Sequence, residues 1–119
     1  MEGDVLFPTS IRHAAQRIQF RAMILVYLVL DQPRFTEYDA HYFPEPHIRI
    51  SRLSEPKNYS GRGSASQTVL CAELPCSTED PEWTLGAEDL SRLVVEALEA
   101  AGLPLAATVK EVTVRRLRH

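Results

Sequence analysis

A run of nine apolar residues, Ala22–Leu30 (AMILVYLVL), constrains the fold more than any other stretch of the chain. Its large and β-branched side chains, closed by Asp-Gln-Pro-Arg, predict a central strand buried on both faces. A membrane-spanning helix needs about 20 apolar residues. This run therefore predicts a strand inside a hydrophobic core, and the sequence predicts no transmembrane segment.

The remaining segments predict two helices and several shorter strands around this central one. A short amphipathic helix is expected over Thr9–Phe20, where Ile11, Ala14, Ala15 and Ile18 recur at helical spacing. The polar stretch Lys57–Gln67, rich in Ser and Gly, predicts a mobile loop. Further strands are expected at Asp39–Phe43, at His47–Ser54, at Thr68–Leu74 with Pro75 ending it, and at Val109–Leu117.

The second helix has the clearest signals for its two ends. Gly86 is the expected N-cap, with Leu85 and Leu90 packing around it as a hydrophobic staple. Gly102 and Pro104 supply the stop signal. The order of elements, with short links, predicts one α+β domain over residues 1–119. We expect a mostly antiparallel sheet of about five strands with the helices packed on one face.

Composition excludes several classes of function. The net charge of −3 argues against a nucleic-acid partner, because phosphate neutralisation needs a basic face. The acidic N-terminus is unlike a signal peptide, which favours a cytoplasmic location. Cys71 and Cys76 are five residues apart, so in a strand they point to opposite faces, and no disulfide is expected.

No self-sufficient catalytic or metal site is visible. The sequence has no glycine-rich phosphate loop and no nucleophile or zinc motif. Asp39 and His41 would share a strand face and could ligate a metal, but two ligands without a third are a weak signal. Surface polar residues on an edge strand are the preferred interpretation, and no metal is expected.

Three stretches resemble the middle of FAD-dependent oxidoreductases of the amine oxidase and protoporphyrinogen oxidase type. They are RFTEYDAHYFPEP from Arg34, ISRLSEPKNYS from Ile50 and TVLCAELPC from Thr68. The likeness is to the UDP-galactopyranose mutase-like branch of that family and is strongest between Tyr38 and Cys76. Because the FAD-binding segments of such enzymes are absent, the resemblance implies only the central substrate-binding domain of a longer protein. FAD would then bind in the parent protein and not in this chain.

The stretch RLSEPKN supplies the candidate site residues. The resemblance implies that Arg52, Lys57 and Asn58 contribute to a substrate site over the flavin, with the two cations facing an anionic group. Glu55 and Pro56 are expected to hold the turn. A purely structural alternative, in which Glu55 forms a network with Arg52 or Lys57 that shapes the loop, stays open.

Two functions from different classes follow. The first is a substrate-binding lid domain of an FAD-dependent oxidoreductase that acts on a small-molecule substrate. The second is a freestanding, non-catalytic binding or dimerisation module that keeps the fold without the cofactor. A domain that exposes an apolar surface tends to associate, so a homo-oligomer is also expected.

Overall fold

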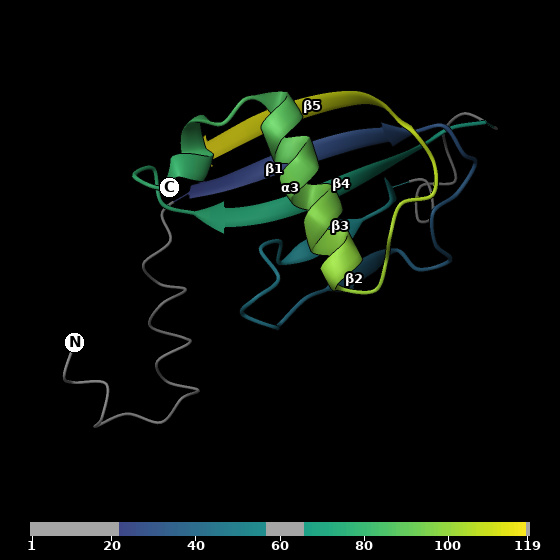
Figure 1. Cartoon of the computed structure of the whole chain (residues 1–119), viewed down its shortest axis with the longest axis horizontal. Helices are drawn as coiled ribbons and strands as arrows, with labels where there is room; N and C mark the ends of the chain where they lie inside the picture. Colours follow the sequence, from purple (N-terminus) through teal and green to yellow (C-terminus); the bar gives the residue numbers. More distant parts are fainter. Residues whose placement is uncertain (1–21, 57–65, 119) are drawn as a thin grey trace.

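The computed structural model describes residues 22–56 and 66–118 and contains one five-stranded sheet crossed by one long helix (Figure 1). The expected helix Thr9–Phe20 and most of the loop Lys57–Gln67 lie outside the described residues. The elements in chain order are β1 (Ala22–Leu30), β2 (Ala40–Tyr42), β3 (Arg52–Ser54), β4 (Thr68–Cys76), the 3-10 helix η2 (Pro81–Thr84), α3 (Ala87–Ala100) and β5 (Val109–Arg118).

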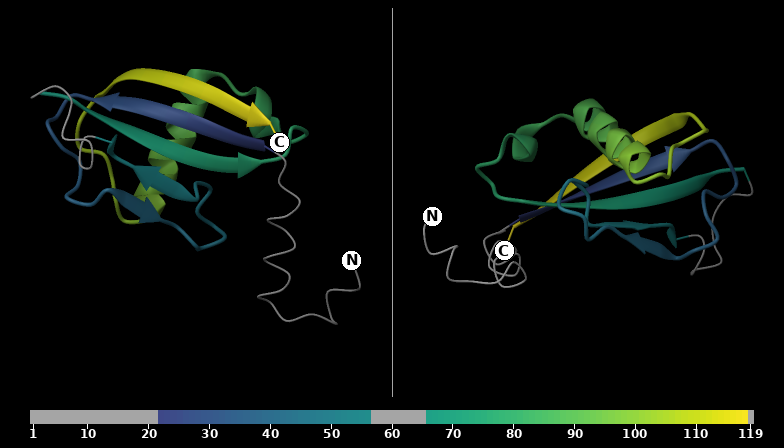
Figure 2. Two further views of the ribbon diagram at one scale, coloured as in Figure 1. Left: turned by 180° about the vertical axis from the view of Figure 1, so that it is seen from behind. Right: turned by 60° about the horizontal axis from the view of Figure 1, so that its bottom comes forward.

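The strands lie in the order β2-β3-β4-β1-β5, and every neighbouring pair is antiparallel. Helix α3 lies across one face of this sheet, and the view from behind shows the other face with no described helix on it (Figure 2). The core forms between sheet and helix, where Leu90, Val94, Ala97 and Leu98 of α3 are buried. The predicted α+β class with a mostly antiparallel sheet is confirmed.

Strand β1 occupies the predicted residues, but it is not buried equally on both faces. Ala22, Ile24, Val26, Leu28 and Leu30 point toward α3 and are buried. The alternate residues are only half-buried. The expectation of burial on both faces was therefore wrong: a run of apolar residues looks the same whether a second layer covers its far face or not.

The third strand is shorter than predicted. Ile48 and Ile50 are buried, as their alternation suggested, yet the regular strand begins only at Arg52. The Ile48 amide donates to the Glu45 carbonyl at 3.1 Å, so Pro46 and His47 form the centre of a turn. This turn delays the pairing with β4, although the isoleucines still reach the core.

Pro75 does not end the fourth strand as expected, because β4 continues to Cys76 and pairs Pro75 with Met23 of β1. The Ser51 amide donates to the Glu73 carbonyl at 2.9 Å, so the polar backbone groups of Glu73 face β3. Two residues later the Pro75 nitrogen faces the same side, beyond the last pair with β3. The missing N–H of proline therefore removes no bond from the sheet.

Both ends of α3 match the sequence signals. Gly86 is the N-cap, and Glu88 and Asp89 lie in the first turn, where the helix dipole favours negative charge. Gly102 follows the helix with φ of 82°, a left-handed conformation that favours glycine. Within the described residues, no helix is long and apolar enough to cross a membrane.

Candidate functional site

On the side of the sheet away from α3, which no helix of the described residues covers, one row of side chains crosses all five strands and is polar on four of them. The strand registers place Tyr42, Arg52, Glu73, Leu25 and Arg115 side by side, one from each strand in spatial order. Arg52 therefore lies on the side of the sheet away from α3, between an aromatic residue and an acid. This row is the candidate site, and we refer to the whole side of the sheet that bears it as the open face.

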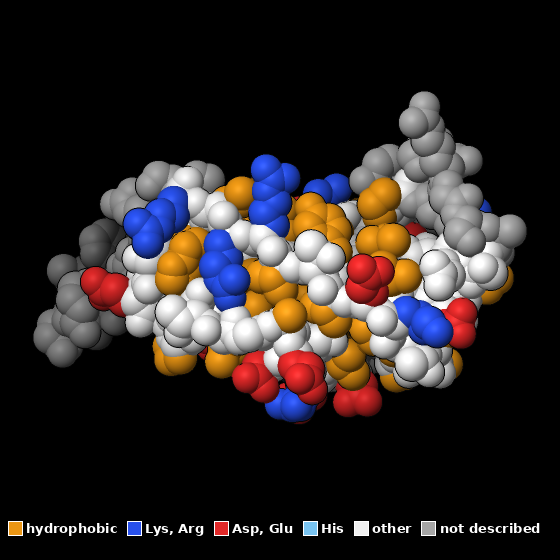
Figure 3. All heavy atoms as spheres, turned by 90° about the horizontal axis from the view of Figure 1, so that it is seen from above, with side chains coloured by type: hydrophobic (Ala, Val, Ile, Leu, Met, Phe, Trp, Pro, Cys, Tyr) orange, Lys and Arg blue, Asp and Glu red, His pale blue; other side chains and the backbone are white. Residues whose placement is uncertain are grey.

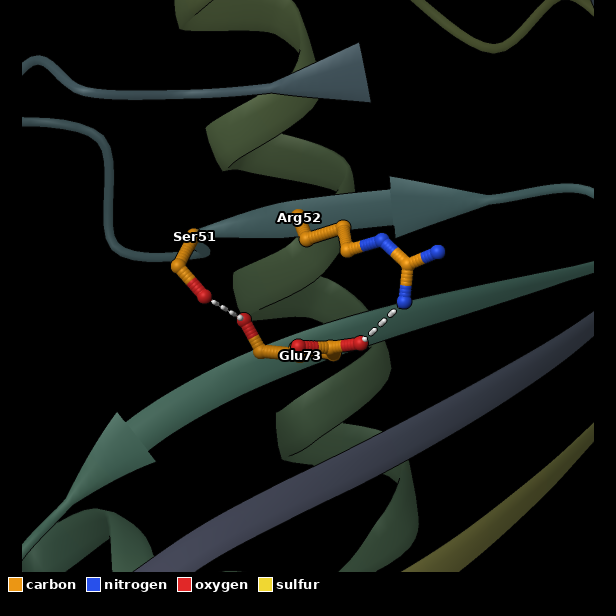
Figure 4. Close-up of polar contacts among 3 residues, drawn as sticks. All are labelled: Ser51, Arg52 and Glu73. Atoms are coloured by element: carbon orange, nitrogen blue, oxygen red, sulfur yellow. Dashed lines mark hydrogen bonds and ion pairs between the residues drawn. The ribbon is translucent and has the colours of Figure 1, made fainter. Parts of the chain in front are cut away.

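Arg52 is held from two sides. One terminal guanidinium nitrogen lies 2.9 Å from a carboxylate oxygen of Glu73 (Figure 4), and the guanidinium carbon lies 5.6 Å from the centre of the Tyr42 ring. The hydrogen bond with Glu73 raises the pKa of Arg52, which stays a cation. Ser51 donates its hydroxyl to the Glu73 carbonyl at 3.4 Å, which ties the start of β3 to the same residue.

This arrangement leaves Arg52 with capacity for another partner. Its Nε is buried and has no hydrogen-bond partner, while its side chain as a whole remains 37% exposed. Glu73 engages a single terminal nitrogen, and a guanidinium carries five donors in a rigid fork. An anionic or carbonyl oxygen that approached the open face would therefore find donors on Arg52 still available.

The next row on the open face combines small polar and apolar groups. It contains Ser54, Cys71, Tyr27 and Thr113, in the order β3, β4, β1 and β5. Ser54 and Cys71 are buried, and burial raises the pKa of the Cys71 thiol. Because the thiolate is the nucleophilic form, the environment of Cys71 disfavours nucleophilic chemistry at this residue.

Half-buried apolar side chains surround the polar rows. Met23, Leu25 and Val29 of β1 are all partly exposed on the open face. Val69 and Pro75 of β4 lie opposite Val29 and Met23 and are also partly exposed. A sheet face with this mixture can bind a flat, partly apolar molecule or a second layer of protein, with Arg52 and Arg115 as cationic groups.

Glu55 lies on the opposite side of the strand from Arg52 and has a different environment. Its side chain is buried and accepts hydrogen bonds from the amides of Phe35 and Thr36, at 2.8 and 3.0 Å. The Thr68 hydroxyl donates to it at 2.6 Å. The carboxylate thus joins the chain after β1 to the start of β4.

Of the two Glu55 networks that the sequence left open, only the one with Arg52 lies within the described residues. Arg52 pairs with Glu73 of β4, so the Arg52–Glu55 network considered from the sequence does not form. Pro56 follows Glu55 and is half-buried. Lys57 and Asn58 lie outside the described residues. Glu73 was missed, although a single acid inside the apolar stretch TVLCAELPC is a signal of a cross-strand partner.

A second feature is an open hollow of about 400 Å³ between β2 and the C-terminal end of α3. Its lining includes His41, Phe43, Glu45, His47 and Leu103. His41 shares a hydrogen bond of 3.2 Å with the Thr36 hydroxyl and stacks on Phe43. In the part of the chain that the structure describes, no three His, Cys, Asp or Glu side chains gather as a metal site would require.

Comparison with known proteins identifies the fold. No protein-family model matches the sequence, and neither does any curated protein. Solved structures do match: a putative protoporphyrinogen oxidase from Exiguobacterium sp. 255-15 has a TM-score of 0.65 and 17% identity over 83% of this chain. A reduced UDP-galactopyranose mutase has a TM-score of 0.64 and 16% identity over 83% of it.

A third match, the PF1083 protein from Pyrococcus furiosus, has a TM-score of 0.50 and 15% identity over 95% of this chain. The matched region is 22%, 21% and 26% of the three proteins, respectively. The chain therefore spans only about a fifth to a quarter of the length of these structures. At such identities the likeness is one of fold: this chain has the architecture of one domain found in oxidoreductase and mutase structures.

Proposed function

We propose that this chain is the substrate-binding domain of an FAD-dependent oxidoreductase and that its open face covers the flavin and substrate. The observation that carries the proposal is the one-sided sheet. Helix α3 covers one face, while the other presents half-buried apolar side chains around Arg52. A domain that forms one wall of a shared pocket needs such a face, because its apolar surface is completed by the neighbouring domain.

The proposed role of Arg52 is to bind and orient an anionic or carbonyl group. Glu73 fixes the guanidinium and Tyr42 flanks it, so the available donors point from a defined position. Lys57 and Asn58 belong to the proposed site by the resemblance in sequence. Electron transfer would be the chemistry of the bound flavin, and the residues of this domain would supply orientation and electrostatics.

The test uses the complete protein encoded by the native reading frame. A strand–glycine-rich turn–helix unit upstream of this chain would supply the phosphate-binding elements that FAD needs. We expect the complete protein to be purified with a bound-flavin absorption spectrum, and the isolated 119-residue chain to bind no FAD. A complete protein without flavin would overturn the proposal.

Variants of the complete protein then test whether the open face forms the substrate wall. Arg52→Met and Leu25→Gln change the open face, whereas Arg92→Met changes an exposed residue of α3 and serves as the matched control. We expect the two open-face variants to keep their flavin but to lose kcat/KM or the spectral response to substrate, and the control to match the wild type. If Arg52→Met and Leu25→Gln retained full turnover, the open face would not be the substrate wall.

A further inference from the structure

The two edges of the sheet differ in a way that points to self-association. The β2 edge is three residues long, which gives another strand little to pair with. At the other edge, β5 is ten residues long and contains no Pro or Gly, and among the described strands it pairs with β1 alone. A long regular edge offers a row of backbone donors and acceptors to any incoming strand.

The charged residues on β5 are placed so that a second copy of β5 can pair with it. Glu111, Thr113 and Arg115 alternate along the open face, next to Val29, Tyr27 and Leu25 of β1. Glu111 and Arg115 are both exposed. When two copies of β5 run antiparallel around a twofold axis at Thr113, each Glu111 lies opposite Arg115 of the other copy, and Val112 lies opposite Val114.

Other symmetric registers lack this match. With an axis at Val112 or Val114, neither Glu111 nor Arg115 faces a residue of the other sign. An axis at Glu111 places the two copies of Glu111 opposite each other, and an axis at Arg115 does the same for Arg115. Like charges directly opposite are destabilising. The regular register with β1 breaks next to Val109, so the matched segment is 111–115.

The same register places Lys110 opposite Arg116, outside the matched segment, but Arg116 already has partners within its own subunit. Arg116 points to the helix side of the sheet, where its guanidinium donates to the backbone carbonyls of Trp83 at 2.6 Å and of Leu85. It is thus engaged within its own subunit. Figure 3, which looks from above onto the side of the molecule where β5 lies in Figure 1, shows Lys and Arg side chains standing among hydrophobic ones.

From the long edge and its self-complementary charges we propose that β5 pairs with β5 of a second copy of this chain. The register is antiparallel and centred on Thr113, so that the two sheets become one continuous ten-stranded sheet. The twofold axis is perpendicular to the sheet, which puts both α3 helices on one side and both open faces on the other. The inference therefore stands independently of what the open face binds.

The test is a charge-swap series on the 119-residue chain, measured by sedimentation equilibrium over a concentration series with circular dichroism as the check on folding. We expect the wild type to reach a dimer mass. Glu111→Arg alone and Arg115→Glu alone should each raise the dimer Kd at least tenfold, because like charges then face each other twice per dimer. The double swap, Glu111→Arg with Arg115→Glu, restores the pairs and should restore the dimer.

Mixing the two single variants supplies the sharpest readout. Glu111→Arg carries cations at both positions and Arg115→Glu carries acids at both, so a heterodimer should form at concentrations at which each variant alone is monomeric. A wild type that stays monomeric at every concentration would overturn the proposal, as would single variants that dimerise like the wild type or a mixture that stays monomeric. In a monomer, protection from hydrogen exchange of the β5 amides that point away from β1 would mean that another segment occupies the edge, which also overturns it.

Discussion

Arg52 and Glu73 lie directly opposite each other in β3 and β4, and their side chains form an ion pair of 2.9 Å on the open face of the sheet. The two residues are 21 positions apart in the sequence. The pair is partly desolvated, with 37% and 23% of the side chains exposed. It therefore fixes the direction of Arg52 more than it stabilises the fold.

Replacement of Glu73 by Gln should reduce the free energy of unfolding by no more than about 1 kcal/mol, the usual range for a partly exposed ion pair. The double variant Arg52→Met/Glu73→Leu should be at least as stable as the wild type, because apolar replacements remove two charges and the unpartnered Nε together. Urea unfolding measures both. A double variant less stable than either single one would show that the pair holds the sheet together.

Replacement of Glu55 by Gln should reduce the free energy of unfolding much more than Glu73→Gln does. Its carboxylate accepts from the Phe35 and Thr36 amides and from the Thr68 hydroxyl. In Glu55→Gln one acceptor becomes an NH₂ donor facing these donors, so we expect a loss of about 1–3 kcal/mol in unfolding free energy. Glu73→Gln is the matched control. Equal losses in the two variants would contradict the structural role of Glu55.

Acid should weaken the contact between Arg49 and Glu82, whose side chains are 2.8 Å apart. The hydrogen bond from Arg49 lowers the pKa of Glu82 below its ordinary value of 4.5. A carboxyl with a lowered folded-state pKa contributes stability above its unfolded-state pKa, and this contribution is lost as pH falls through the folded-state pKa. The stabilising effect of Arg49 should therefore be present at neutral pH, begin to fall below about pH 4.5 and disappear once the pH is below the lowered pKa of Glu82.

Thermal melts as a function of pH check this expectation. Arg49→Met should lower the Tm at neutral pH and match the wild type in strong acid. Arg92→Met is the control, because the Arg92–Asp89 pair is exposed on both sides and contributes little at any pH. A difference between Arg49→Met and wild type that stays constant down to low pH would exclude Glu82 as the linked group.

Features determined by local sequence were predictable, as the ends of α3 illustrate. Gly86 and Gly102 act on their own backbone, so they mark the helix without knowledge of the rest of the fold. The nine residues of β1 likewise have one plausible secondary structure. In both cases the signal and its effect lie within a few residues of each other.

The candidate site was predictable only in part because it depends on strand register. The strand-end stretch drew attention to Arg52 and Glu55, but not to their partners Glu73 and Thr68. Those partners come from β4, and their positions follow from how β4 aligns with β3, which the local pattern of neither strand specifies. The half-buried side of β1 was not predictable either, since apolar character alone does not reveal which face a helix covers.

The final prediction concerns Gly102, which follows α3, because the space around it and its backbone conformation can be tested separately. A Cβ built on Gly102 meets no atom within 4 Å, so packing leaves room for a larger residue. Its φ of 82°, however, is unfavourable for residues with a Cβ. Gly102→Ala should therefore lower the unfolding free energy by about 1 kcal/mol from backbone strain alone.

Gly86 is the matched control, since a Cβ there also meets nothing within 4 Å but its φ is −73°. Gly86→Ser should leave the stability unchanged or raise it by a few tenths of a kcal/mol, because Ser is a better N-cap than Gly. Gly102→Asn should lose less than Gly102→Ala, because Asn tolerates the left-handed conformation better. Denaturant melts of the three variants give the comparison, and an alanine at position 102 that cost nothing would mean that the end of α3 adopts another turn in solution.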